Sequence, residues 1–248
     1  MMSHYKVLDE PNWVYHEIDF KENAIRKVGK IKKETLLAGG IRTPSSFGGY
    51  PELSDEPSSV ADGPYYHVHP VDLRTLDAFN DPPRIFHKID KYLPTLIISE
   101  CCLCYLTPAA ADTVTLYFTK HFFPESTPLG MIIYEPIKPD DAFGKTMVSN
   151  LAARGIVLQT LRKYGSLEAQ AERFKSYGFT GSRGFDINKL WEKAIDAAEK
   201  ERVAGLEMLD EVEEWELLAS HYCVVWGWQE LEGEQAADVW DAWKTIFP

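Results

Sequence analysis

The chain has 248 residues and a formal net charge of −12 at pH 7, with 45% hydrophobic and 26% charged residues. This length suits one substantial core, and the composition is ordinary for a globular protein. No apolar run approaches the roughly 18 residues of a membrane-spanning helix, and no secretory or transit pattern opens the chain. The acidic balance without a basic block argues against nucleic-acid binding. We therefore expect a cytoplasmic protein, or one shared with the nucleus, that binds neither nucleic acid nor membrane.

Strand-like and helix-like runs alternate from the start to the end of the chain, which predicts an α/β fold with a mostly parallel sheet. Thr107 and Pro108 form a typical helix start, an N-cap followed by proline in the first turn. Residues 39–63 are rich in Gly, Pro and Ser, which predicts a flexible surface loop. Strands are expected at residues 13–20, 66–71, 95–99 and 130–134, and helices at 21–33 and 107–119.

The second half of the chain is richer in helical patterns. Apolar spacing predicts helices at residues 143–163, 167–177, 190–198 and 206–219. A short strand is expected at 179–185. The β-branched and aromatic run at 222–228 predicts a further strand near the edge of the sheet.

Three of the four cysteines lie in one apolar run, LIISECCLCYL, which reads as a buried strand. Strand alternation would put Cys102 and Cys104 on one face and Cys101 on the other. That arrangement suits neither a zinc site nor a disulfide framework. We expect these cysteines to be small buried hydrophobes in a reducing compartment.

Three successive predicted strands end in an acid, namely Asp19, Asp72 and Glu100. Ligands of open α/β sheets bind outside the carboxyl ends of the strands. Carboxylates there can accept hydrogen bonds from the ribose hydroxyls and the adenine amine of an adenosine cofactor, or lie near its amino-acid part. The alternative for each acid is an N-cap or a surface position. The pattern favours a cofactor-binding edge.

His67 and His69 point to the same face of one predicted strand, as two metal ligands would. No third ligand at helical or strand spacing accompanies them, so we expect no metal. No Walker loop, G-x-S-x-G elbow or H-E-x-x-H motif occurs in the sequence.

Several longer segments resemble the leucine carboxyl methyltransferases. The run LPTLIISECCLCYLTPAAAD looks like the fourth-strand motif of that family, and YEPIKPDDAFGKTMVSNLAARG resembles its Y-E followed by F-G-x-x-M-x-x-N. SLEAQAERFKSYGF and LDEVEEWELLASHYCVVWGW are similar to two further family segments, and VYHEIDF and HPVDLR to its second- and third-strand motifs. Together they cover most of the chain beyond Trp13.

The resemblance implies S-adenosyl-L-methionine as cofactor and methyl transfer to the C-terminal leucine carboxylate of the protein phosphatase 2A catalytic subunit. It implies a Rossmann-like class I methyltransferase fold with extra helices in the C-terminal half, acting as a monomer when complete. The implied roles are ribose binding by Asp19, adenine contact by Asp72 and Leu73, cofactor binding by Glu100, a catalytic position for Tyr105 and contact with the substrate tail by Arg154.

The chemistry of such a transfer needs little catalytic apparatus. A C-terminal carboxylate has a pKa of about 3.5, so it is ionised and nucleophilic at neutral pH. The sulfonium donor is already activated. The enzyme then works by alignment and by exclusion of water.

The chain departs from the family pattern at its N-terminus. The glycine-rich loop L-G-x-G-x-D-T after the first strand is absent, as are an upstream arginine and lysine. We therefore expect one incomplete methyltransferase domain over residues 1–248 that lacks the central first strand, and low or absent activity in this form. The alternatives are a non-enzymatic phosphatase-binding remnant, a relative of the tRNA wybutosine methyltransferases and an unrelated nucleotide-binding α/β protein.

Overall fold

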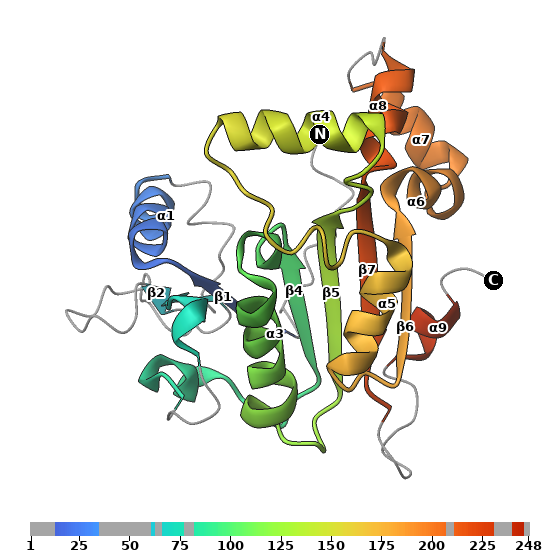
Figure 1. Ribbon diagram of the computed structural model, residues 1–248. Coiled ribbons are helices and arrows are strands. Elements are labelled where there is room, and N and C mark those ends of the chain that lie inside the picture. Colours follow the sequence, from blue (N-terminus) through green and yellow to red (C-terminus); the bar gives the residue numbers. More distant parts are fainter. Residues whose placement is uncertain are drawn as a thin grey trace. The chain divides into compact units, whose positions relative to one another are not determined.

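A computed structural model describes residues 13–34, 61–62, 66–76, 82–206, 211–230 and 240–245. The chain forms two compact units, Met1–Asp90 and Lys91–Pro248, and each contains its own sheet (Figure 1). Helices and strands alternate in both, which confirms the α/β class. The prediction of a single domain over residues 1–248 stays a prediction.

Unit 1 contains a three-stranded sheet in the order β1-β3-β2. The strands β1 (Tyr15–Asp19) and β3 (Tyr66–Pro70) are parallel, and the two-residue strand β2 (Ala61–Asp62) runs antiparallel to β3. Helix α1 (Lys21–Lys33) connects onward from β1, as the sequence predicts. Two 3-10 turns, Leu73–Thr75 and Arg84–Lys88, follow β3.

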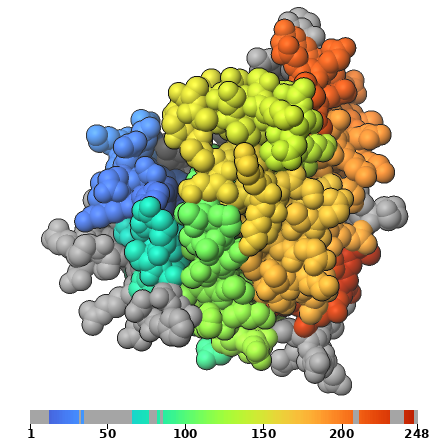
Figure 2. Space-filling model, viewed as in Figure 1, coloured from blue at the N-terminus to red at the C-terminus, as the bar shows by residue number. Residues whose placement is uncertain are grey.

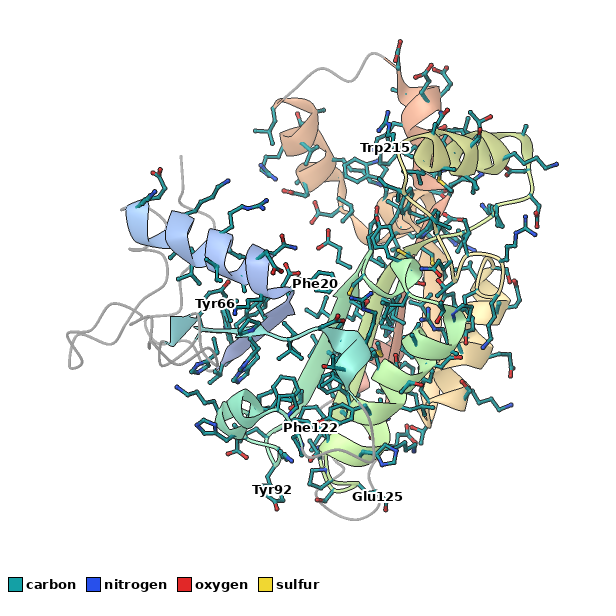
Figure 3. The ribbon with its side chains drawn as sticks, turned by 60° about the vertical axis from the view of Figure 1, so that its left-hand side comes forward. Phe20, Tyr66, Tyr92, Phe122, Glu125 and Trp215 are labelled. Carbon is teal, nitrogen blue, oxygen red and sulfur yellow. The ribbon has the colours of Figure 1, made fainter. Side chains whose placement is uncertain are left out.

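The core of unit 1 forms between α1 and β3. Ala24 and Val28 are four residues apart and therefore lie on the same face of the helix. They are fully buried against Val68, and Tyr66 packs against the same cluster (Figure 3). The spacing of apolar residues in α1 is thus the local reason for its orientation on the sheet.

Unit 2 contains a four-stranded sheet in the order β4-β5-β7-β6. The strands β4 (Thr95–Glu100) and β5 (Leu129–Pro136) are parallel. The strand β7 (Tyr222–Trp228) is antiparallel to both β5 and β6 (Gly181–Asp186).

The helices of unit 2 cover this sheet. On one face α3 and α5 lie side by side in front of the strands, and α4 crosses near the carboxyl ends of β4 and β5 (Figures 1 and 2). On the other face Trp226 and Trp228 pack with Trp240, Trp243 and Leu190. The helices are α3 (Pro108–Leu116, continued by a π-helical turn at Tyr117–Phe122), α4 (Ala142–Ala153), α5 (Leu167–Ser176), α6 (Ile187–Ala194), α7 (Ala197–Ala204), α8 (Val212–Ala219) and α9 (Asp241–Thr245).

The predicted edge position of residues 222–228 is wrong, because β7 pairs with a strand on each side. Its aromatic and β-branched residues are buried on both faces, as in an interior strand. The composition of such a run does not distinguish an edge strand from an interior strand of a sheet.

Two predicted helices have different extents. The helix predicted over residues 143–163 ends at Ala153, because Gly155 takes a positive φ of 76° and the N–H of Ile156 bonds back to the carbonyl of Leu151. The helix predicted over residues 190–198 is two helices, and Asp196 caps the second through the N–H of Glu199.

The predicted strand through the cysteines is also shorter than expected. It ends at Glu100, and Cys101 has a positive φ of 41°, which turns the chain out of the strand. The 3-10 turn η3 (Leu103–Tyr105) follows. Of the predicted loop at 39–63, residues 39–60 and 63 lie outside the described residues, and 61–62 form β2.

Candidate functional site

Asp19 and Asp72 lie at the same end of the sheet of unit 1. Asp19 is opposite Pro70 in the parallel register, and the N–H of Val71 donates to the carbonyl of Asp19 at 3.0 Å. Asp72 is the next residue. Asp19 is therefore the last residue of β1 and Asp72 lies two residues past β3, at the carboxyl ends of parallel strands, where α/β sheets bind ligands.

One of the two oxygens of the Asp19 carboxylate is hydrogen-bonded. Its Oδ1 accepts hydrogen bonds from the N–H of Phe20 at 2.7 Å and from Nδ2 of Asn23 at 3.2 Å. Its Oδ2 accepts none from the described residues. One oxygen is therefore held in place, and the other can accept a hydroxyl group.

The Asp72 carboxylate is fully engaged by Arg74. The guanidinium donates from Nε to Oδ1 at 2.9 Å and from Nη2 to Oδ2 at 2.6 Å. These bonds lower the pKa of Asp72. The following turn uses the N–H groups of Arg74, Thr75 and Leu76 and, within the described residues, leaves that of Leu73 free to donate.

Glu100 and Tyr105 lie on either side of the turn that follows β4 in unit 2. Glu100 is exposed at the end of the strand, and Tyr105 is 44% exposed. The side-chain amide of Gln159 donates to the carbonyl of Tyr105 at 2.6 Å and holds the turn in place. Burial, followed by the nearby thiols of Cys104 and Cys101, raises the pKa of the Tyr105 hydroxyl, so it remains a hydrogen-bond donor at neutral pH.

Arg154 caps the C-terminal end of α4, where its side chain is exposed and forms no ion pair within the described part of the chain. This leaves it available to a carboxylate. The geometry assigns it no role, and its contact with a substrate tail stays a prediction.

The three strand-end acids do not share one sheet. Asp19 ends β1 and Asp72 follows β3 in the unit 1 sheet, whereas Glu100 ends β4 of the unit 2 sheet. The expectation of a single sheet edge is wrong for the described residues, because β1 and β4 have no common neighbouring strand among them. The roles given to these acids stay predictions.

Sequence reasoning missed a third histidine beside His67 and His69. The parallel register puts His16 opposite His67, and its Nδ1 lies 2.9 Å from Nε2 of His69. The His16 and His67 rings are stacked 4.8 Å apart at 12°, so their nitrogens do not converge on one point. No group of His, Cys, Asp or Glu among the described residues has the arrangement of a metal site.

Comparison with known proteins identifies the family. The family model described as leucine carboxyl methyltransferase matches residues 3–118. Leucine carboxyl methyltransferase 1 of Aspergillus fumigatus is 50% identical over 94% of this chain and 62% of its own length. The same enzyme of Emericella nidulans is 48% identical over 87% and 58%. The homologue from Arabidopsis thaliana is 34% identical over 93% of this chain and 67% of its own length. The chain belongs to the leucine carboxyl methyltransferase family.

This member of the leucine carboxyl methyltransferase family spans 62% of the length of the Aspergillus fumigatus relative and 58% of the length of the Emericella nidulans relative. One solved structure that is distantly similar is PigF with SAH. It is 13% identical with a TM-score of 0.43 and covers 86% of this chain and 43% of its own. Among the described residues, no helix combines the length and apolar character needed to cross a membrane.

Proposed function

We propose that this chain takes part in S-adenosyl-L-methionine-dependent methylation of the C-terminal leucine carboxylate of the protein phosphatase 2A catalytic subunit. One observation carries the proposal. Two carboxylates, those of Asp19 and Glu100, are the last residues of parallel strands in a member of this family, and within the described part of the chain each has an acceptor oxygen without a donor.

The residues of unit 1 fit the adenosine part of the cofactor. The free Oδ2 of Asp19 would accept from a ribose hydroxyl, and the N–H of Leu73 would donate to the adenine ring. Asp72 fits less well, because an amine would have to share its oxygens with Arg74. For Glu100 the family resemblance implies a cofactor contact. When bound, the cofactor supplies an activated methyl group.

The remaining residues would bind and align the substrate. The Tyr105 hydroxyl stays protonated and can donate a hydrogen bond to the leucine carboxylate without losing its own proton. Arg154 would pair with acids of the tail. Since the carboxylate is already ionised, no residue needs to act as a base. Alignment and exclusion of water would supply the rate enhancement.

A second part of the proposal is that the family fold contains a central strand and a glycine-rich loop in addition to these elements. It is supported by the edge of β4 that faces away from β5. The N–H groups of Thr95 and Cys101 bond to β5, so the backbone groups of Leu96, Ile98 and Glu100 point to the other edge. That edge of β4 has no partner strand among the described residues. Ile98 is 58% exposed on it. Unpaired apolar edges favour self-association.

Cofactor titration by calorimetry and methyl transfer from labelled donor to the phosphatase catalytic subunit test the proposal. The 248-residue chain is compared with a chimera that adds the N-terminal part of the Aspergillus fumigatus relative. We expect turnover only in the chimera and cofactor binding at least a hundredfold weaker in the chain alone, about 2.7 kcal/mol. Comparable turnover by the 248-residue chain and the chimera would overturn the proposal that activity needs the added central strand and loop. Phosphatase binding by a chimera that binds no cofactor would instead favour the non-enzymatic alternative.

Matched variants of the chimera test the two acids. Asp19→Ala should cost about 1.5–3 kcal/mol of cofactor binding, as for a charge-assisted hydrogen bond. Glu22→Ala on the exposed face of α1 is its control. Glu100→Ala is paired with Glu125→Ala, which lies before β5 at the opposite end of unit 2 (Figure 3). If a test variant and its control bound the cofactor with equal affinity, the acid tested would have no part in cofactor binding.

A further inference from the structure

Helix α4 lies near the carboxyl ends of β4 and β5 with little hydrophobic packing to hold it there (Figure 1). Of its 12 residues, Ala142–Ala153, only Gly144 is buried. An isolated helix of this length is marginal in water, and packing of an apolar face usually stabilises it. The position of α4 therefore depends on contacts at its ends rather than on a buried face.

His221 contacts the start of this helix. It is 1% exposed, and its ring lies between the end of α8 and Asp141, the N-cap of α4. Nε2 is 2.9 Å from both carboxylate oxygens of Asp141, and Nδ1 is 2.8 Å from the carbonyl oxygen of Leu217. The ring of Phe143 lies against the imidazole, with the centroids 4.4 Å apart. One side chain thus joins α8 to the first turn of α4.

The backbone of His221 is fixed on both sides, so the ring is held in a defined position. Its N–H donates to the carbonyl of Leu218 at 2.9 Å, and its carbonyl accepts from the N–H of Ile137, directly after β5, at 2.8 Å. The next residue, Tyr222, begins β7. The hydrogen bond between His221 and Asp141 therefore connects α4 to the sheet.

The partners of the ring determine which of its nitrogens carry protons. The carbonyl of Leu217 and an ionised carboxylate can only accept hydrogen bonds. Asp141 stays ionised at neutral pH, because the N–H of Gly144, followed by His221, lowers its pKa. The hydroxyl of Ser220, 3.3 Å from Nδ1, donates to the same Leu217 carbonyl. The ring makes both bonds only when each nitrogen carries a proton, and the bond to Asp141 is then charge-assisted.

We propose that His221 is a positioning residue that connects α4 to the sheet through Asp141 and so fixes the helix near the carboxyl ends of β4 and β5. Glu100 ends β4, and the turn with Tyr105 follows it. Arg154 is the C-cap of α4. The link to substrate binding rests on the proposed function: a helix held in this position would present Arg154 to the substrate tail. His221 would act through the helix and contact neither cofactor nor substrate.

Hydrogen exchange of the 248-residue chain, followed by NMR, tests the connection. His221→Phe keeps a ring against Phe143 but removes both hydrogen bonds. Asp141→Ser keeps a capping oxygen for the N–H of Gly144 but is too short to reach the ring. In both variants the amides of α4 should exchange about tenfold faster or more, as for a lost charge-assisted bond, while those of α5 keep their rates. His121→Phe, at an exposed histidine, is the matched control and should change neither helix.

A conservative variant and a double variant sharpen this test. Asp141→Asn keeps the capping oxygen and offers an N–H to Nε2 of a neutral ring, so it should retain the slow exchange of α4. The double variant His221→Phe with Asp141→Ser should exchange no faster than either single variant, because both remove the same contact. Wild-type exchange of α4 in Asp141→Ser, or equal acceleration of α4 and α5, would overturn the proposal. Because Asp141 is exposed, its variants also decide the question if His221→Phe does not fold.

The link to substrate binding is tested separately in the chimera. Asp141→Ser should raise KM for the phosphatase catalytic subunit about tenfold and leave cofactor affinity unchanged, and Asp141→Asn should restore KM. An unchanged KM in a variant whose α4 exchanges faster would overturn the link to substrate binding. A chimera without turnover would overturn this link together with the proposed function, while hydrogen exchange still decides whether His221 holds α4.

Discussion

The two units bury polar side chains in opposite ways. In unit 1, His16, His67 and His69 stack on one face of the β1–β3 pair as a cluster of neutral rings. In unit 2, Glu135 and Arg173 are buried as an ion pair with Nη1 to Oε2 at 2.9 Å. A buried charge is costly unless it is neutralised or paired, and each unit uses one of these two solutions.

The ion pair belongs to a network that joins three elements. Arg173 on α5 donates from Nε to the hydroxyl of Tyr177 at 2.6 Å, and that hydroxyl donates to Asp112 on α3 at 2.8 Å. The Arg173 guanidinium also lies 4.2 Å from the centre of the Tyr164 ring. Glu135 contributes from β5. The stability of unit 2 therefore depends on each buried charge keeping its oppositely charged partner. The stability of unit 1 depends on its buried histidines staying unprotonated.

The largest expected effect comes from breaking the ion pair on one side. Arg173→Met leaves a buried carboxylate without its cation and should lower the free energy of unfolding by about 3–5 kcal/mol. Denaturation in urea, followed by tryptophan fluorescence, measures this loss. The double variant Glu135→Leu with Arg173→Met should lose less, because it removes both charges. A single variant as stable as the double one would contradict the paired-charge account.

Acidification should act on the histidine cluster. Burial, followed by His67, lowers the pKa of His16 to about 4, and burial, then His16, His67 and His87, lowers that of His69 to about 3. The unfolded chain binds these protons at a pKa of about 6.5. The stabilising contribution is therefore complete above pH 6.5 and is lost as pH falls toward the folded values.

This loss should be on the order of 2 kcal/mol between pH 6.5 and 4.5, carried mainly by buried His69 and reduced by solvent screening at half-exposed His16. Urea denaturation at a series of pH values measures it. His69→Leu should flatten the pH profile, and His121→Gln, an exposed histidine of unit 2, should not. If stability depended on pH in the same way in both variants, the histidine cluster would not be the source of the acid sensitivity.

A smaller effect is expected from the hydroxyl in the middle of the network. Tyr177→Phe removes one acceptor for Arg173 and one donor to Asp112, which should cost about 1–2 kcal/mol of stability. Tyr92→Phe, at an exposed tyrosine (Figure 3), serves as the matched control. Equal unfolding midpoints in urea for the two variants would show that the hydroxyl is not part of the stabilising network.

The smallest effect is expected at the exposed Asp72–Arg74 pair. Such pairs contribute little to stability, so Arg74→Ala should leave the unfolding midpoint unchanged. It should, however, release Oδ2 of Asp72, leave Oδ1 bonded to the backbone N–H of residue 74, and raise the acid's lowered pKa toward its ordinary value, which NMR titration of the Asp72 carboxyl measures. An unchanged titration would show that Arg74 does not hold Asp72 in solution.

Features that depend on neighbouring residues could be predicted from the sequence. The helix of residues 21–33 coincides with its prediction, because its apolar spacing and its contact with β3 agree. Thr107 caps α3 through the N–H of Ala110, as the Thr-Pro pair indicates. The acids at the strand ends were found because a strand's end is itself a local feature.

Features that depend on strand order, register and backbone reversal could not be predicted. The interior position of β7 follows from which strands pair, and its composition is compatible with either position. His16 meets His67 only because two strands separated by 46 residues run in register, from β1 ending at Asp19 to β3 beginning at Tyr66.

The sequence by itself determined the family, the α/β class and the strand-end positions of Asp19, Asp72 and Glu100. These follow from local patterns that each short segment carries. Only the tertiary structure decided that Arg74 binds the carboxylate of Asp72 and that three histidine rings stack. The physical reason is that side-chain partners are set by register and by single backbone torsions, such as the positive φ of Cys101, which residue spacing does not encode.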